Sequence, residues 1–469
     1  MWNRTWRLLA LALPMAISAC GGGSSSVDLP SDAPTALRSP LATSRLAASR
    51  KGAIPGDFDG DGRIDLIWSG ELIDEGSNFA GIYIGLQAAA DKPQRLALGG
   101  PLPSTGFPVR YHLQDTADFD GDGKADLVAE AQPISWAGPI PALWTDLMLL
   151  DGARLVQRVR LPLAEGERVI AAADFDGDGR PDLLTVSNEW GDEDPVYALL
   201  LMDGTRLRSR HVLIDNPARP SWRGRERILA VVDADGDGRA DLITSRRTEL
   251  SPYSSTSFNW DYARREPLSI WYMNGASPRQ VVTVVPAGVL LAVGDFNGDG
   301  HADLLLRQDD QIDNGRNFIR LLRDGKVLEE RLLATGRPYN QSGTSEQVLD
   351  IDGDGKDDLL FDGVSLWAMD GAWPRATWNL QENLWQPPHL YYSRATYIPQ
   401  HKTPFALLRV DRTLSEPGCF TYIGLTWSQG RWVEAPYPLD TEWFGGAMPS
   451  DYSSIASPWR RGQQRATAR

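Results

Sequence analysis

Residues 57–65 read Asp-Phe-Asp-Gly-Asp-Gly-Arg-Ile-Asp and run directly into the apolar residues Leu-Ile-Trp. Close relatives of this nine-residue loop begin at Asp118, Asp174, Asp233, Asp295 and Asp350. The six starting points are separated by 61, 56, 59, 62 and 55 residues. A period this regular is typical of a repeat array, in which each repeat forms one supersecondary unit.

Every copy has oxygen-bearing side chains at loop positions 1, 3, 5 and 9, and glycines at positions 4 and 6. This pattern suits calcium, which takes six to eight oxygen ligands, because glycine lets the chain fold around the ion. Position 7 is expected to add only its backbone carbonyl, so its side chain is free to vary and faces solvent. We therefore predict about six calcium ions.

The predicted ligands, with the seventh residue of each loop binding through its carbonyl, are Asp57, Asp59, Asp61, Arg63 and Asp65; Asp118, Asp120, Asp122, Lys124 and Asp126; Asp174, Asp176, Asp178, Arg180 and Asp182; Asp233, Asp235, Asp237, Arg239 and Asp241; Asp295, Asn297, Asp299, His301 and Asp303; and Asp350, Asp352, Asp354, Lys356 and Asp358.

Other kinds of loop fit the pattern less well. An EF-hand loop begins in the same way but ends in a bidentate glutamate at position 12. The residues at that position here offer no carboxylate: Trp68, Ala129, Thr185, Thr244, Leu306 and Phe361. Magnesium needs stricter octahedral geometry, and zinc favours histidine or cysteine, so both rank below calcium. Acidic turns that bind nothing remain the alternative, although six such clusters would repel themselves.

Apolar runs flank the loops and predict strands rather than helices. Residues 168–173 precede one loop, and residues 183–185 follow it. A third run, residues 198–204, ends in Asp-Gly, which is a strong signal for a β-hairpin. A fourth strand should follow, as in residues 210–214. Each period is therefore predicted to be a four-stranded antiparallel unit, and such units repeated radially form a β-propeller.

These motifs resemble the FG-GAP and VCBS repeats of bacterial surface proteins and of integrin α-subunit propellers. The resemblance rests on Asp-x-Asp-Gly-Asp-Gly-x-x-Asp-Leu with a downstream Trp-x-Met-Asn/Asp-Gly hairpin, and covers about residues 50–375. It implies an all-β, seven-bladed, calcium-binding propeller used in adhesion or glycan binding. We place this propeller at residues 50–440, with Phe405–Asp411 as the pre-loop strand of a degenerate seventh blade that lacks the acidic loop. A six-bladed ring with an appended C-terminal segment is the alternative.

The first residues of the chain predict an export signal. Residues 1–19 contain two arginines before an apolar run that is too short to span a membrane. Residues 17–20, Ile-Ser-Ala-Cys, resemble the lipobox of bacterial lipoproteins, which implies that Cys20 is acylated after the signal is cut. By the same resemblance, Gly21 favours the outer membrane of a Gram-negative bacterium, with the chain facing the periplasm or the cell surface. An ordinary signal peptide is the alternative.

Two further segments flank the predicted propeller. Residues 20–49 begin with the acylated cysteine and continue with glycines and serines, which predict a flexible linker. Residues 441–469 form a C-terminal segment that ends in a basic tail.

Composition narrows the choice of partner. The chain has 47 Lys and Arg against 62 Asp and Glu, a net charge of −15, which argues against nucleic acid. We expect a monomeric, non-catalytic module that binds glycan or protein at the cell surface, with the insertions at 190–194 and 253–262 as candidate contacts. Tryptophans after residue 366 either stack on sugars or pack the last repeat. The alternative function is a polysaccharide-active lyase or hydrolase with its site on the propeller face.

Overall fold

The computed structural model divides into two compact units, residues 1–36 and residues 37–469. The described residues all lie in the second unit; they are 57–60, 66–74, 77–86, 94–96, 109–133, 143–187, 195–215, 226–246, 267–286, 288–308, 316–333, 347–349, 354–361, 365–379, 393–397, 405–411, 420–428 and 431–435. The predicted signal peptide, Cys20, the linker, both insertions and the C-terminal segment lie outside them. None of the described residues forms a helix long and apolar enough to cross a lipid bilayer.

The secondary structure of the described residues consists of strands, which form one three-stranded and six four-stranded antiparallel sheets. Within each sheet the strands are neighbours in chain order. The first four sheets are β1 (Leu66–Asp74), β2 (Ser77–Gly85) and β3 (Gln94–Arg95); β4 (Val109–Ala117), β5 (Asp126–Pro133), β6 (Trp144–Asp151) and β7 (Arg154–Arg160); β8 (Arg168–Ala173), β9 (Asp182–Ser187), β10 (Val196–Asp203) and β11 (Arg206–Asp215); and β12 (Glu226–Val232), β13 (Asp241–Arg246), β14 (Leu268–Asn274) and β15 (Ser277–Val285).

The remaining three sheets are β16 (Val289–Gly294), β17 (Asp303–Gln308), β18 (Arg316–Arg323) and β19 (Lys326–Leu333); β20 (Gln347–Leu349), β21 (Asp358–Phe361), β22 (Ser365–Asp370) and β23 (Trp373–Asn379); and β24 (Ser393–Tyr397), β25 (Phe405–Asp411), β26 (Phe420–Ser428) and β27 (Arg431–Ala435).

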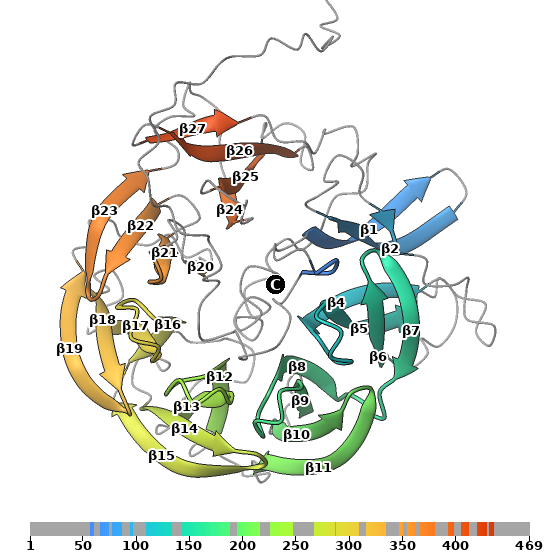
Figure 1. The fold of residues 1–469 in the computed structure, drawn as a ribbon, viewed down its shortest axis with the longest axis horizontal. Coiled ribbons are helices and arrows are strands. Elements are labelled where there is room, and N and C mark those ends of the chain that lie inside the picture. Colours follow the sequence, from blue (N-terminus) through green and yellow to red (C-terminus); the bar gives the residue numbers. More distant parts are fainter. Residues whose placement is uncertain are drawn as a thin grey trace, which may run out of the picture. The chain divides into compact units, whose positions relative to one another are not determined.

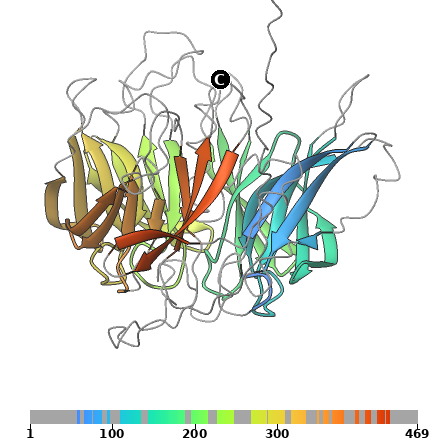
Figure 2. The same cartoon turned by 90° about the horizontal axis from the view of Figure 1, so that it is seen from above.

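Successive sheets lie side by side in chain order, with the first strand of each four-stranded sheet innermost and the fourth outermost (Figures 1 and 2). Side-chain burial decreases in the same direction. The inner strands β8 and β9 are buried along most of their length, whereas the outermost strands β7 and β11 are largely exposed. The arrangement is that of a β-propeller. It confirms the predicted all-β fold built from four-stranded antiparallel sheets, and the count of seven blades stays a prediction.

The last sheet differs from the prediction in its alignment. Phe405–Asp411 was expected to be the first strand of a repeat, but it is β25, the second strand, because β24 precedes it and pairs with it. This repeat has no acidic loop, so the sequence carries no marker for the boundary between its first and second strands.

The predicted hairpins between third and fourth strands are present. In the sheet β8–β11 the turn is formed by Gly204 and Thr205, and Gly204 has φ of 61°, which favours glycine. Just beyond this turn the register shifts between Leu201 and Met202, so one residue of β11 bulges out of the pairing. The same shift recurs in the sheets that contain β7, β15, β19 and β23.

In four of the acidic loops, a phenylalanine at position 2 joins one sheet to the next. Phe175 precedes β9, yet it packs in a cluster with Leu242 and Met273 of the following sheet. Phe58, Phe119 and Phe296 occupy equivalent clusters, and all four rings have no exposed surface. Ala234 takes this place in one loop. Apolar burial therefore stabilises the joint between consecutive sheets rather than each sheet alone.

We expect Phe175→Ala to lower the free energy of unfolding by about 3–5 kcal/mol, because it leaves a cavity between two sheets. Chemical denaturation would measure the loss. Val212→Ala on β11 is the control, since Val212 is 57% exposed and its loss should cost less than about 1 kcal/mol. Equal losses from both variants would contradict the packing described above.

Candidate metal centre

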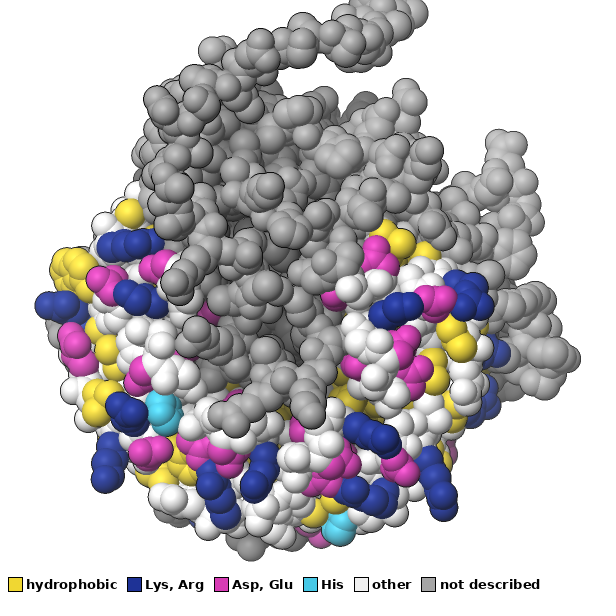
Figure 3. Space-filling view, viewed as in Figure 1, with side chains coloured by type: hydrophobic (Ala, Val, Ile, Leu, Met, Phe, Trp, Pro, Cys, Tyr) yellow, Lys and Arg dark blue, Asp and Glu magenta, His cyan; other side chains and the backbone are white. Residues whose placement is uncertain are grey.

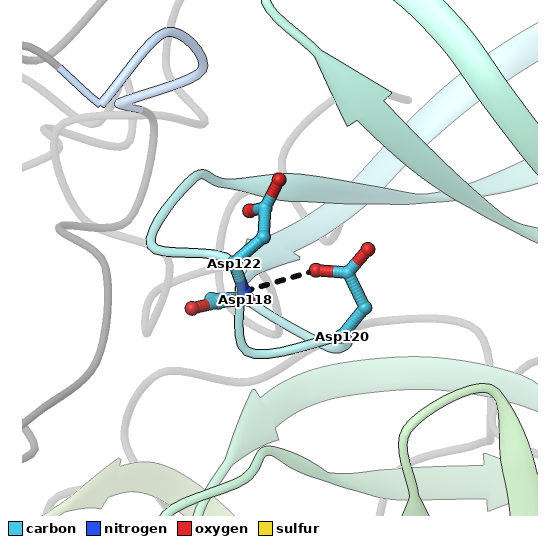
Figure 4. A group of neighbouring side chains, drawn as sticks. All are labelled: Asp118, Asp120 and Asp122. Carbon is cyan, nitrogen blue, oxygen red and sulfur yellow. Dashed lines mark hydrogen bonds between the residues drawn. The ribbon is translucent and has the colours of Figure 1, made fainter.

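The acidic loop connects the first and second strands of a sheet and is organised by its own carboxylates. In the loop 118–126, Asp118 accepts hydrogen bonds from the backbone N–H groups of Gly121 at 2.7 Å and Gly123 at 3.0 Å. Asp120 accepts from the N–H of Asp122 at 3.1 Å (Figure 4), and Asp122 accepts from the N–H of Lys124 at 2.9 Å. The loops that begin at Asp174, Asp233 and Asp295 repeat this pattern.

Glycine is required at loop positions 4 and 6. Gly121 has φ of 79° and Gly123 has φ of 90°, a left-handed conformation that side chains with a Cβ rarely adopt. At Gly236 an added Cβ would also lie 2.8 Å from the carbonyl oxygen of Gly300 in the next loop.

The turn brings several carboxylates together. Oxygens of Asp118, Asp120 and Asp122 lie within 4.8 Å of one another. Two further groups of the same kind are Asp174, Asp176 and Asp182, and Asp233, Asp235 and Asp241. This set contains only oxygen donors on a tight turn, so the described residues fit a hard cation such as calcium. These oxygens would hold the ion, and its charge would offset the repulsion between the carboxylates.

The aspartate at position 9 ties the loop to the third strand. Asp126 is fully buried, and its two oxygens accept from the N–H of Phe119 at 2.8 Å and of Leu150 at 2.9 Å. Asp182, Asp241 and Asp303 make the same two bonds in their sheets. Position 9 is therefore a structural carboxylate as well as a predicted ligand.

Burial makes ionisation of these carboxylates costly. It raises the pKa of Asp126 and of Asp182 to about 7, and neighbouring carboxylates of the same loop act in the same direction. It raises the pKa of Asp241 and of Asp303 to about 8. The position-1 carboxylate Asp233 is affected similarly, with its pKa raised to about 6.

The side chain at position 7 has a partner on the hairpin of its own sheet, which the sequence did not reveal. Lys124 forms an ion pair with Asp151 of its own hairpin, and Arg239 donates to Asn274 at 2.7 Å. The corresponding pairs in two other sheets are Arg180 with Asp203 and Lys356 with Asp370. His301 is half-buried, and its Nδ1 atom is buried without a hydrogen bond to the described residues.

Backbone hydrogen bonds connect the loops that begin at Asp57, Asp174 and Asp295 to the following sheet. The N–H of Ala125, at position 8 of one loop, donates to the carbonyl of Asp57 in the preceding loop at 2.6 Å. The N–H of Gly152, in the hairpin of the same sheet, donates to the carbonyl of Phe58 at 2.8 Å. Equivalent pairs recur as Ala240 to Asp174, Gly275 to Phe175, Asp357 to Asp295, and Gly371 to Phe296. The acidic loops are thus joints between consecutive sheets.

Arginines on three of the outermost strands reach the acidic loops, which the sequence analysis did not anticipate. Arg208 pairs with Asp176, Arg279 pairs with Asp235, and Arg375 lies 3.4 Å from Asp354. A sequence signal for them exists, because each arginine follows the Asp-Gly or Asn-Gly of its hairpin at the same spacing.

Five predicted ligands, which belong to the first and last acidic loops, lie outside the described residues: Asp61, Arg63, Asp65, Asp350 and Asp352. Of the tryptophans after residue 366, Trp367 is half-buried. Trp373 is 52% exposed, and the guanidinium of Arg331 lies 4.4 Å from the centre of its ring.

The double role of position 9 gives a prediction. Asp303→Ala should lower the free energy of unfolding by about 3 kcal/mol even in chelator, because the buried N–H groups of Phe296 and Leu322 lose their acceptor. Asp299→Ala at exposed position 5 is the control and should cost less than about 1 kcal/mol in chelator. Denaturant unfolding with and without calcium would measure both, and equal losses in chelator would refute the structural role of Asp303.

Several solved structures are similar to this chain at low sequence identity. The exotype rhamnogalacturonan lyase YesX is similar with a TM-score of 0.30 and 16% identity, over 62% of this chain and 56% of that chain. The Bacillus licheniformis rhamnogalacturonan lyase PL11 is similar with a TM-score of 0.31 and 13% identity, over 82% of this chain and 76% of that chain. The Dos1 propeller is similar with a TM-score of 0.41 and 11% identity, over 82% of both chains. A search of curated proteins found no match. Residues 174–244 and 295–361 match the model of the FG-GAP-like repeat, so the chain carries FG-GAP-like repeats in a β-propeller.

Proposed function

We propose that this chain is a calcium-stabilised β-propeller that is anchored by a lipid on Cys20 and binds a glycan or protein ligand without catalysing a reaction. Its anchor would hold it at the outer membrane of a Gram-negative bacterium, where it acts as a monomer. The observation that carries the proposal is the position of the acidic loops at the joints between consecutive sheets.

Calcium at these joints would have a structural role. The loops bring together carboxylates whose pKa values are raised by burial and by each other, so a divalent cation would stabilise their ionised form. The position-2 side chains of these loops pack in the core of the next sheet. A cation that orders the loop therefore also orders the contact between two sheets, and binding would contribute to folding free energy.

Ligand contacts are proposed at the end of the sheets away from the acidic loops. The acidic loops and the hairpins share one end, as the bond from Gly275 to Phe175 requires. At the opposite end, second strands connect to third strands through segments of unequal length, such as residues 188–195 and 247–267. Variable connections on a rigid scaffold often carry binding residues. The stretch 253–262 contains three tyrosines or tryptophans, whose rings suit stacking on sugars.

The distribution of surface charge bears on the kind of ligand that the chain would bind. Figure 3 shows acidic and basic side chains interleaved over the described sheets rather than separated into patches of one sign. On the face drawn, this mixture of charges favours a ligand recognised by shape and stacking over a polyanion held by charge.

Calcium should raise the melting temperature of the chain by about 10 °C or more, whereas magnesium at the same concentration should not. Each site contributes about 1.4 kcal/mol when free calcium exceeds the dissociation constant tenfold. Differential scanning fluorimetry of protein prepared in chelator and titrated with each metal would measure the effect. If the melting temperature does not change in calcium, the proposal that calcium is a cofactor of this chain is wrong.

Cys20→Ser should move the expressed protein from the membrane fraction to the soluble fraction without loss of ligand binding, because the lipid serves only as an anchor. Cell fractionation would follow the first effect, and a glycan array in calcium the second. Wild-type protein is the control for both measurements. Unsaturated sugar products released from polysaccharide, detected by their ultraviolet absorbance, would instead establish a lyase.

A further inference from the structure

We propose that Arg208, Arg279 and Arg375 are built-in counterions that compete with calcium, so that the acidic loops fall into a weaker and a tighter class. This inference rests on the proposed role of calcium and concerns how the chain's own residues set its affinity. The bulged residue of the outermost strand decides the class of the five loops that lie in four-stranded sheets.

The three arginines occupy one structural position. In the pairing of β10 with β11, Leu201 faces Ser209 and Met202 faces Leu207, which leaves Arg208 as the unpaired residue of a bulge. Arg279 in β15 and Arg375 in β23 are the unpaired residues of the matching bulges. A bulge redirects the side chain of its extra residue. Here it directs a guanidinium to the acidic loop of the same sheet.

The arginines contact carboxylate oxygens that do not accept hydrogen bonds from the backbone of the loop. Asp176 and Asp178 each use Oδ1 to accept a backbone N–H of the loop. Arg208 pairs with Oδ2 of Asp176 and lies 3.4 Å from Oδ2 of Asp178. In the next sheet, Arg279 pairs with Oδ2 of Asp235 and lies 3.2 Å from Oδ2 of Asp237, and Arg375 approaches Oδ2 of Asp354.

Competition follows from this arrangement. A calcium ion needs six to eight oxygen ligands, and the oxygens at positions 3 and 5 are among the few that the loop can offer. A guanidinium has donors only, so it cannot join the coordination of a cation. Its positive charge also repels one at close range. Calcium must therefore displace the arginine before it uses these oxygens.

Two loops have no such competitor at the bulge. The bulged residues are Val156 in β7 and Leu328 in β19, which are 55% and 57% exposed. Their loops, 118–126 and 295–303, have the same turn hydrogen bonds as the others. These two loops should therefore bind calcium more tightly than the three arginine loops. Without calcium, the arginine loops would be the better neutralised ones.

The test is calcium titration calorimetry on the full chain and two reciprocal variants. Arg208→Gln should tighten binding at one site by about tenfold, because the competing charge is gone. Val156→Arg should weaken one of the tight sites by a similar factor. Arg206→Gln is the matched control, since Arg206 is exposed on the same strand and lies two residues away. Adding Asp174→Asn to Arg208→Gln should abolish the gain and so assign it to the loop 174–182.

Melting in chelator supplies a second readout. Arg208→Gln should lower the melting temperature of the calcium-free protein, whereas Arg206→Gln should leave it unchanged, because only Arg208 pairs with the loop carboxylates. Unchanged or weaker calcium binding by Arg208→Gln would overturn the competition while leaving the calcium role intact. If neither the wild type nor any variant binds calcium, the proposed calcium role itself is wrong.

Discussion

The buried carboxylate at loop position 9 is the interaction on which each repeat depends. Asp182 accepts one N–H from Phe175 in its own loop and another from Met202 in the third strand, so a single side chain fixes the loop against the sheet. With the loop fixed, the ring of Phe175 is held in the core of the next sheet, and the carbonyl of Phe175 receives the N–H of Gly275. Packing between sheets thus begins with an ionisable group inside a turn.

This design concentrates negative charge where the sheets meet, and the chain balances it in several ways. Backbone N–H groups satisfy part of each carboxylate, basic residues at position 7 pair with the hairpin aspartates, and arginines reach three of the loops. Each of these is a partial solution, because hydrogen bonds satisfy the oxygens without supplying the charge of a divalent ion. A bound cation would complete the balance where the arginines are absent.

Much of this was predictable from sequence, because the repeat is strict where backbone geometry is strict. The glycines at positions 4 and 6 adopt left-handed conformations, and the Asp-Gly and Asn-Gly hairpins form where they were expected. The sequence could not show that a lysine such as Lys124 is paired, since charge alone does not reveal a partner across the sheet. Nor could it reveal which residue of β11 bulges, because a register shift depends on the pairing of two strands. The position of Phe405–Asp411 in the last sheet was not predicted correctly, because this repeat has no acidic loop to mark the boundary between its first two strands.

The outermost strands have a further consequence for association with other chains. Each leaves one edge without a neighbouring strand in its sheet, and an exposed edge is a template for pairing with a strand of another molecule. β19 has the sequence Lys-Val-Leu-Glu-Glu-Arg-Leu-Leu, and β7 carries Arg154, Arg158 and Arg160. Charges along an edge, together with the bulges that twist it, discourage edge-to-edge addition. The bulges that direct arginines to the acidic loops therefore also help to keep neighbouring copies from joining sheet to sheet.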